Sequence, residues 1–266
     1  MSGSFPERGA SPATMASGTA RPSDRRVLWL IARRGALESL RDRMTLGFNL
    51  FFVFVFPLGI VLAVVRAQVG TLIAADRGDA VGTVLAIFCL SVGLTPATGA
   101  VGIASGQFAG EKEQGNLAPL LASPASNFAI FGGKILGSVL PAMGFVLVAE
   151  AVYFTSLALV GGVGTLRLVP VRLSLLLLSL VPPVAIFAAT VASLISSRVR
   201  TYSAAQQISG LVLVPFWGGI VVLLTRFQDG GLPFLLVALA ALVVIDAALI
   251  ALAASTWRRE EVLAQR

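Results

Sequence analysis

Residues 110–137, GEKEQGNLAPLLASPASNFAIFGGKILG, are a long polar passage in an otherwise apolar chain. A hydrophobic stretch long enough to cross a bilayer lies on each side of this passage. Hydrocarbon is a poor solvent for charged side chains and irregular backbone, and this segment combines charges with two prolines and several glycines. We therefore expect the passage to project into water on one side of a membrane and to meet a partner there.

The composition of the whole chain also indicates a membrane setting. Of its 266 residues, 56% are hydrophobic and 12% are charged, and the mean hydropathy is +0.90, whereas a soluble domain carries about 25% charged residues. The net charge of +7 suits basic flanks that orient membrane spans and contact anionic lipid better than it suits nucleic-acid binding. The chain has no His, the commonest general base, and Cys89 lies in an apolar run, where a packed thiol is expected.

The first 44 residues divide into two parts. Residues 1–23 are rich in Ser, Gly, Pro and Ala and lack the apolar core of a signal peptide, so we expect a disordered tail. Residues 24–44 carry apolar side chains at roughly helical spacing among six arginines. This pattern is typical of an amphipathic helix that lies in the membrane interface, and an ordinary helix in the cytosol is the alternative.

Six apolar stretches follow, each near the roughly 20 residues that a bilayer crossing requires. Their predicted bounds are Leu46–Val65, Val81–Ser105, Phe128–Val160, Val171–Ser196, Ile208–Thr225 and Leu232–Ser255. The third is too long for one straight crossing and should tilt or extend beyond the bilayer. Prolines inside the spans are expected to mark kinks; they are Pro57, Pro96, Pro141, Pro182, Pro183 and Pro215. The predicted fold class is an all-α membrane protein with six transmembrane helices over residues 45–256.

The basic residues are distributed unevenly over the connections between these spans. With the N-terminus inside, 15 of the 20 Lys and Arg residues fall on the inner side and 5 on the outer side. The positive-inside rule then places both termini in the cytoplasm, including the tail at 257–266. The polar passage is predicted to form a loop over residues 107–127, which then also faces the cytoplasm. The outer connections are short and leave no room for an external catalytic or receptor domain.

The polar passage has an internal order that a solvated connector does not need. A charged cluster at 111–114 is interrupted by Gly115, which predicts a turn. Leucines with i, i+3, i+4 spacing then predict a short amphipathic helix; they are Leu117, Leu120 and Leu121. Ser123-Pro124 would end that helix, and Asn127 would cap the next span. The functional interpretation is a docking element.

The sequence contains no recognisable catalytic motif. In the nearest approach to a P-loop, Lys134 follows Gly133, but Phe128 stands where the first glycine is required and Ile135 where a Ser or Thr would hold magnesium. The GxSxG, HExxH and CxxC patterns are absent as well. We therefore expect this chain not to be an enzyme and to bind no cofactor or metal of its own.

Two carboxylates fall inside predicted spans, where ionisable groups are costly and are functional candidates by default. Glu150 lies sixteen residues beyond Lys134, about 24 Å along a helix, and so toward the outer side. The alternative to a transport role for Glu150 is simple contact with water. Asp246 lies nearer mid-depth, and its alternative is a hydrogen bond to a neighbouring helix.

The polar passage resembles the signature of ABC-2 type transporter permeases, and within them the sodium- or drug-export-like branch. The corresponding loop of that family typically reads GEKE-x-G-x-L-x-x-LL-x-(S/T)-P, followed by GK on the next helix. The matching positions are Gly110, Glu111, Glu113, Gly115, Leu117, Leu120, Leu121, Ser123, Pro124, Gly133 and Lys134.

Three other segments are similar to the same family. IARRGALESLRDRMTL at 31–46 resembles its interfacial helix, although Gly35-Ala36 replace the Lys-Glu often found there. SAAQQISGLVLVP at 203–215 is similar to the beginning of its fifth helix, and WRREEVL at 257–263 to its C-terminal tail. The resemblance covers almost the whole chain from Asp24 onward.

The resemblance implies six membrane helices with cytoplasmic ends, a pair of permease chains in the cytoplasmic (inner) membrane, and two separate ATPase subunits that bind ATP and magnesium. It also implies that the loop between helices two and three docks on the ATPase. The expected docking residues are Glu111, Glu113, Gly115, Leu117, Leu120, Leu121, Ser123 and Pro124. The cargo would be a lipophilic compound, a drug or an ion. The rival functions are an ion-driven carrier or channel that uses Asp246 and Glu150, or a non-transporting membrane anchor of an envelope or motility machine.

Overall fold

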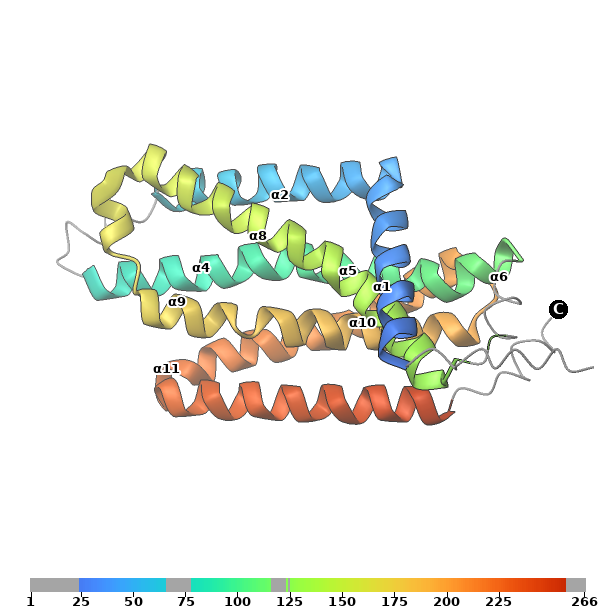
Figure 1. The fold of residues 1–266 in the computed structure, drawn as a ribbon. Helices are drawn as coiled ribbons and strands as arrows, with labels where there is room; N and C mark the ends of the chain where they lie inside the picture. Colours follow the sequence, from blue (N-terminus) through green and yellow to red (C-terminus); the bar gives the residue numbers. More distant parts are fainter. Residues whose placement is uncertain (1–23, 66–77, 116–122, 124, 257–266) are drawn as a thin grey trace, which may run out of the picture.

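The structure is a computed structural model that describes residues 24–65, 78–115, 123 and 125–256. The described part of the chain forms helices joined by short connections. Most of the long helices lie side by side along one axis, and α1 crosses them at one end (Figure 1). The predicted tails at 1–23 and 257–266 lie outside the described residues.

The helices follow one another closely along the chain. In order they are α1 Asp24–Arg41, α2 Arg43–Val64, α4 Gly78–Thr98, α5 Ala100–Ser105, the π-helix η2 Gly106–Gly110, α6 Glu111–Glu113, α8 Asn127–Arg167, α9 Val171–Leu178, α10 Val181–Arg198 and α11 Tyr202–Thr256. The predicted helix at 24–44 is present as α1, which ends at Arg41, and α2 begins two residues later.

Five helical segments among the described residues are long and apolar enough to cross a membrane. They are Leu46–Val64, Asp79–Glu113, Asn127–Arg167, Val171–Arg198 and Gly231–Ser255. The chain is therefore a multi-pass membrane protein. The fifth of the six predicted spans, Ile208–Thr225, is helical but is not among these segments, and it stays a prediction. It lies in the first arm of α11, which doubles back at Gly231, where φ is 59° and ψ is −154° (Figure 1).

Two predictions about helix boundaries need correction. The cluster at 111–114 was expected to be a turn, but the helical path through α4, α5 and η2 continues to Glu113 and turns only at Gln114 and Gly115. Gly115 has φ 71°, a left-handed conformation that suits glycine, so its predicted role in the turn is confirmed. The cap of α8 is Ser126 and not Asn127, because the Ser126 hydroxyl accepts a hydrogen bond from Ala129 N at 3.1 Å.

The third predicted span is indeed longer than one crossing. α8 has 41 residues and continues to Arg167, with a break at Gly162, where φ is 76°. At about 1.5 Å per residue this length is about twice the thickness of a bilayer core. The helix is therefore too long for one straight crossing, and it bends back at its far end (Figure 1).

Proline positions coincide with helix boundaries in two places. Pro96 precedes the break between α4 and α5, where Gly99 N donates to Pro96 O at 3.0 Å. Pro182 and Pro183 occupy the first turn of α10. The N–H groups of a first turn have no carbonyl partner within the helix, so the missing N–H of proline costs no helical hydrogen bond there. The remaining predicted kink positions lie inside helices that continue past them; they are Pro57, Pro141 and Pro215.

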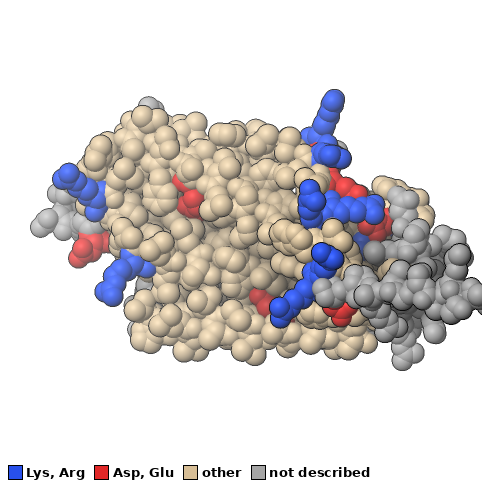
Figure 2. Space-filling view, viewed as in Figure 1, with Lys and Arg blue, Asp and Glu red and all other residues tan. Residues whose placement is uncertain are grey.

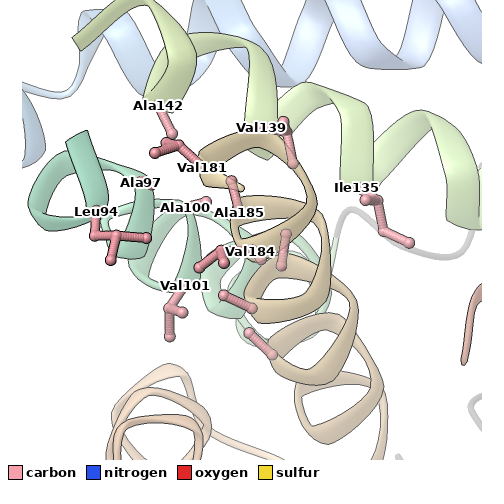
Figure 3. Close-up of a cluster of buried hydrophobic side chains, with 14 of the residues drawn as sticks. Leu94, Ala97, Ala100, Val101, Ile135, Val139, Ala142, Val181, Val184 and Ala185 are labelled. Carbon is pink, nitrogen blue, oxygen red and sulfur yellow. The ribbon is translucent and has the colours of Figure 1, made fainter. Parts of the chain in front are cut away.

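The core of the bundle lies where α4, α5, α8 and α10 meet. Many of its side chains are small, and this lets the helix backbones approach closely, as is usual where lipid gives no hydrophobic drive between helices. Figure 3 shows part of this cluster, in which Ala97 and Ala100 face Val181 and Ala185. In the spans that include α4, α8 and α10, 56–61% of the residues in the apolar stretch are buried inside the protein. The corresponding share is 28% for α2 and 11% for the last arm of α11. These two therefore lie at the periphery.

Candidate functional site

The charged residues of the polar passage emerge where several helix ends meet. α6 lies at the same end of the bundle as α1, the start of α8, the end of α10 and the start of α11, and we call this the α6 end (Figure 1). Of the predicted docking residues, the structure describes Glu111, Glu113, Gly115 and Ser123. The others fall outside the described residues, and with them the predicted amphipathic helix; they are Leu117, Leu120, Leu121 and Pro124.

Glu111 pairs with a buried lysine of α8. Its Oε2 lies 2.6 Å from Lys134 Nζ, and the exposed fractions of the two side chains are 24% and 2%. Lys134 Nζ also donates to the backbone carbonyl of Gln107 and lies 4.6 Å from the centre of the Phe108 ring. A buried ammonium needs such partners because it has lost its water. Glu111 therefore joins α6 to α8 through a strong interaction.

The next two charges of the passage bond to two other helices. Lys112 Nζ donates to the carbonyls of Ser197 at 2.6 Å and Val199 at 3.3 Å, at the C-terminal end of α10, where the free carbonyls and the helix dipole favour a cation. Glu113 Oε1 accepts from Tyr202 N at 3.0 Å, at the first residue of α11, where a free N–H favours a carboxylate. Three consecutive charges thus connect α6 to α8, α10 and α11.

A serine of α10 is inserted into the helix that leads to α6. Ser196 Oγ accepts from Ala109 N at 2.8 Å and donates to Ser105 O at 2.6 Å. In a regular α-helix the Ala109 N–H would donate directly to the Ser105 carbonyl. A hydroxyl placed between these two groups widens the turn, and the π-helix η2 is found at this position. Ser196 therefore helps to set the direction in which the α6 charges point.

α1 lies very close to the part of α8 that carries Lys134. A Cβ added at Gly133 would lie 2.9 Å from Leu28 O, and one at Gly137 would lie 3.1 Å from Ala32 O. Gly133 and Gly137 form a G-x-x-x-G pair, the spacing that lets two helices in a membrane protein touch through their backbones. The α1 helix therefore packs directly over the Lys134 turn.

Among the cavities that the described residues line, two adjoin the α6 end. The first, of about 390 Å³, lies between α1, η2 with α6, and the start of α11, and its wall combines charged and polar groups with apolar ones. On its α1 side, Arg34 Nε bonds to Glu38 Oε1 at 2.7 Å, which raises the pKa of Arg34. On its α11 side, burial and, to a smaller extent, the charge of Asp42 raise the pKa of Tyr202. Charged and polar groups therefore line this cavity.

The second cavity, of about 640 Å³, lies between α2, the junction of α4 and α5, and α11. Its wall combines aromatic and polar side chains. They include Phe48, Phe52, Trp217, Asn49, Thr95 and Gln206. A cavity of this kind suits a molecule with an apolar body and hydrogen-bonding groups.

The two membrane carboxylates lie away from these cavities. Glu150 is 8% exposed and accepts a hydrogen bond from Cys89 Sγ at 3.2 Å, between α8 and α4, so it packs inside the bundle and does not face water. Asp246 on α11 is 4% exposed. Glu150 Oε1 and Asp246 Oδ1 have no hydrogen-bond partner among the described residues, so the expected bond from Asp246 to a neighbouring helix is not found for that oxygen. No hydrogen bond joins the two carboxylates in that part of the chain.

The residues that hold α6 in place were only partly foreseen. Glu111 and Glu113 were predicted as site residues, but their partners Lys134 and Tyr202, and the insertion of Ser196, were not. The G-x-x-x-G spacing around Lys134 was a usable sequence signal for close packing, whereas Ser196 is one of three serines in an apolar helix and carries no such signal.

Comparison with known proteins assigns neither a family nor a function to this chain. No protein-family model matches the chain, and no curated protein matches it significantly. Across the described residues, no group of three or more His, Cys, Asp or Glu side chains is arranged to hold a metal ion.

Proposed function

We propose that this protein is the membrane subunit of an ABC-2 type exporter, which moves its cargo with ATP hydrolysed by separate subunits. The observation that carries the proposal is the bonding of Glu111, Lys112 and Glu113 to three different membrane helices. A loop that only connects two spans has no need of such contacts. A loop that receives force from a partner needs them, since each contact passes a displacement of α6 to another helix.

The division of roles within the passage follows from these contacts. Glu111 and Glu113 already have partners inside the chain, so we assign them to the linkage between α6 and the bundle. The leucines at 117, 120 and 121 would then supply the contact with the ATPase, with their apolar face in a groove of that subunit. Closure of the ATPase pair on ATP would move the docked leucines, and α6 would pass this movement to α8, α10 and α11.

Charge supports a cytoplasmic position for the α6 end. Lys and Arg gather at both ends of the bundle and are sparse along its middle (Figure 2). Among the described residues, most of them belong to the α6 end, including six arginines between Arg25 and Arg43, while the opposite end has Arg167, Arg172 and Arg226. By the positive-inside rule the α6 end would face the cytoplasm, where ATP is available. We propose the cytoplasmic membrane as the location.

The cargo and the second permease chain belong to the same proposal. The cavity of about 640 Å³ between α2, α4–α5 and α11 supports a lipophilic cargo that also carries polar groups. Its wall includes α2, which lies at the periphery of the bundle, so a second permease chain, identical or related, could complete it. An ABC-2 exporter would work as such a pair with two ATPase subunits.

The decisive test is replacement of Leu117 and Leu120 by Asp, with co-purification of the ATPase subunit and ATP-dependent transport as the measurements. Both should be lost, because a carboxylate cannot occupy an apolar groove without a partner. A matched control is Val163→Asp with Val171→Asp, two exposed apolar residues at the other end of the bundle, which should leave the complex intact. Unchanged binding together with full transport in the leucine variant would contradict the proposal.

A second candidate function rests on the burial of Asp246 and Glu150. In an ion-driven carrier these carboxylates would bind the driving ion or proton. Asp246→Asn separates the cases: loss of transport with intact ATPase coupling would indicate a direct ion role, within an ABC-2 assembly or outside one. A complex that binds the ATPase but moves none of a panel of candidate substrates would favour a membrane anchor.

A further inference from the structure

The outward face of α1 combines arginines with large apolar side chains. Arg26, Leu30, Arg33 and Leu37 are spaced by four, three and four residues, so they lie along one side of the helix. The inward side packs on α8 through Ala32, which is fully buried. We propose that the outward face of α1 binds the headgroups of anionic phospholipids in the membrane leaflet at the α6 end.

Exposure of the apolar residues argues against bulk water as the surroundings of this face. Trp29 and Leu30 are both 55% exposed, and Leu37 and Leu40 are both 43% exposed, all on one helix of 18 residues. Single apolar residues on a protein surface need no explanation, but four on one helix form a patch. Tryptophan and leucine beside arginine are the residues that an interfacial helix presents to headgroups and the upper acyl chains.

The position of α1 in the fold favours lipid over a protein partner. α1 runs across the long helices (Figure 1), and so parallel to the plane of a membrane that those helices span. The span in α2 begins at Leu46, five residues after α1 ends at Arg41. At about 1.5 Å per residue, this short distance keeps α1 at the depth of the headgroups.

The charges on this face select the kind of lipid. Arg25, Arg26 and Arg33 are exposed, and the acidic Glu38 is already bonded to Arg34 on the flank that faces the cavity of about 390 Å³. Arginine binds phosphate oxygens through two parallel hydrogen bonds. A zwitterionic headgroup neutralises its own phosphate, so a net negative headgroup is the better partner. The inward side of α1 contacts the Lys134 turn, and bound lipid would therefore support the α6 end from outside.

The test uses the full chain in neutral detergent micelles, titrated with phosphatidylglycerol or phosphatidylcholine and followed by native mass spectrometry. The wild type should retain phosphatidylglycerol preferentially, and the preference should decrease with added salt. Arg26→Gln with Arg33→Gln should weaken phosphatidylglycerol binding roughly 30-fold, from the contribution of two basic residues at a membrane surface. Arg26→Lys with Arg33→Lys should retain most of the binding, and circular dichroism checks that each variant is folded.

The matched control is Arg167→Gln with Arg172→Gln, two exposed arginines at the opposite end of the bundle, which should leave phosphatidylglycerol binding unchanged. Equal losses in both pairs would overturn the proposal, since they would reflect net charge alone. Wild-type lipid binding in the α1 variant would overturn it too. If that variant also lost an ATPase subunit on purification, the face would be a protein-binding surface. The lipid measurement needs no ATPase, so it is independent of the exporter proposal.

Discussion

The two ends of the bundle are stabilised in different ways. At the α6 end, consecutive charges bond to helix ends and to a buried lysine, and a serine is inserted into a neighbouring helix. At the opposite end, α2, α4 and α8 pack through an apolar cluster that includes Val61, Leu85 and Leu157. Apolar packing tolerates small changes of shape, whereas a network of directed polar contacts depends on each partner. The difference indicates that the α6 end is built to hold one arrangement of its charges.

The largest effect is expected from Glu111→Ala, which leaves the Lys134 charge buried without its carboxylate. Loss of one member of a buried ion pair costs about 3 kcal/mol or more, so the free energy of unfolding in mild detergent should decrease by that amount. Replacement of both partners, Glu111→Leu with Lys134→Met, should recover much of the loss because no charge is left unpaired. A double variant no more stable than Glu111→Ala would contradict this account.

The next effect concerns the close approach of α1 to α8. In Gly133→Ala the new Cβ would lie 2.9 Å from the Leu28 carbonyl, so α1 must shift, at a cost of about 1–3 kcal/mol for an overpacked contact. Gly144→Ala on the same helix meets no atom within 4 Å and should be neutral or slightly stabilising. Thermal unfolding of the two variants compares the α6 end with the middle of α8. Equal stabilities would show that α1 does not depend on this contact.

A smaller effect is expected from Ser196→Ala, which removes the hydroxyl between Ala109 N and Ser105 O. Loss of these hydrogen bonds should cost about 1–2 kcal/mol, and the π-turn should relax toward a regular α-helix. Hydrogen exchange at residues 105–113 should report the change. Ser138→Ala is the control, because within the described part of the chain the Ser138 hydroxyl donates to the carbonyl four residues earlier in its own helix and not to another helix. Identical exchange in both variants would exclude a role for Ser196 in shaping η2.

Glu150 bonds to Cys89, which belongs to the apolar cluster of α2, α4 and α8. We expect Glu150→Gln to change the free energy of unfolding by less than about 1 kcal/mol. Glutamine preserves the shape and can still accept the hydrogen bond from Cys89, and Glu150 Oε1 has no partner to lose among the described residues. Chemical unfolding of this variant beside Glu111→Ala gives the contrast directly. A loss as large as that of Glu111→Ala would show that Glu150 has a charged partner, and would strengthen the carrier hypothesis.

The smallest effect is expected for the exposed pair Arg34–Glu38 on α1. Their side chains are 70% and 56% exposed, and exposed pairs at i, i+4 contribute about 0.3–0.5 kcal/mol. Glu38→Gln should therefore change the unfolding free energy by no more than this, and less at high salt. A change as large as that of Glu111→Ala would mean that the ion pair has a further stabilising role in the cavity of about 390 Å³ that it lines.

Sequence reasoning succeeded where long apolar segments or strong local signals decide the structure. The spans predicted from Leu46, Phe128 and Val171 are found to begin at Leu46, Asn127 and Val171. These spans and the left-handed turn at Gly115 follow from hydropathy and backbone preference, which act over a few neighbouring residues. It failed by one residue at the cap of α8, where Ser126 and Asn127 are both good caps. It also placed a turn at 111–114, because four consecutive polar residues leave no trace of the helix that continues through them.

The sequence by itself determined that this is a multi-pass helical membrane protein with a polar passage between apolar spans, since burial in lipid depends on side-chain composition alone. The tertiary structure decided which groups that passage bonds to. Glu111 meets Lys134 after 23 residues, and Lys112 and Glu113 reach α10 and α11 after more than 80. Such distant pairs depend on how the helices pack, and helix packing is set by many small contacts together.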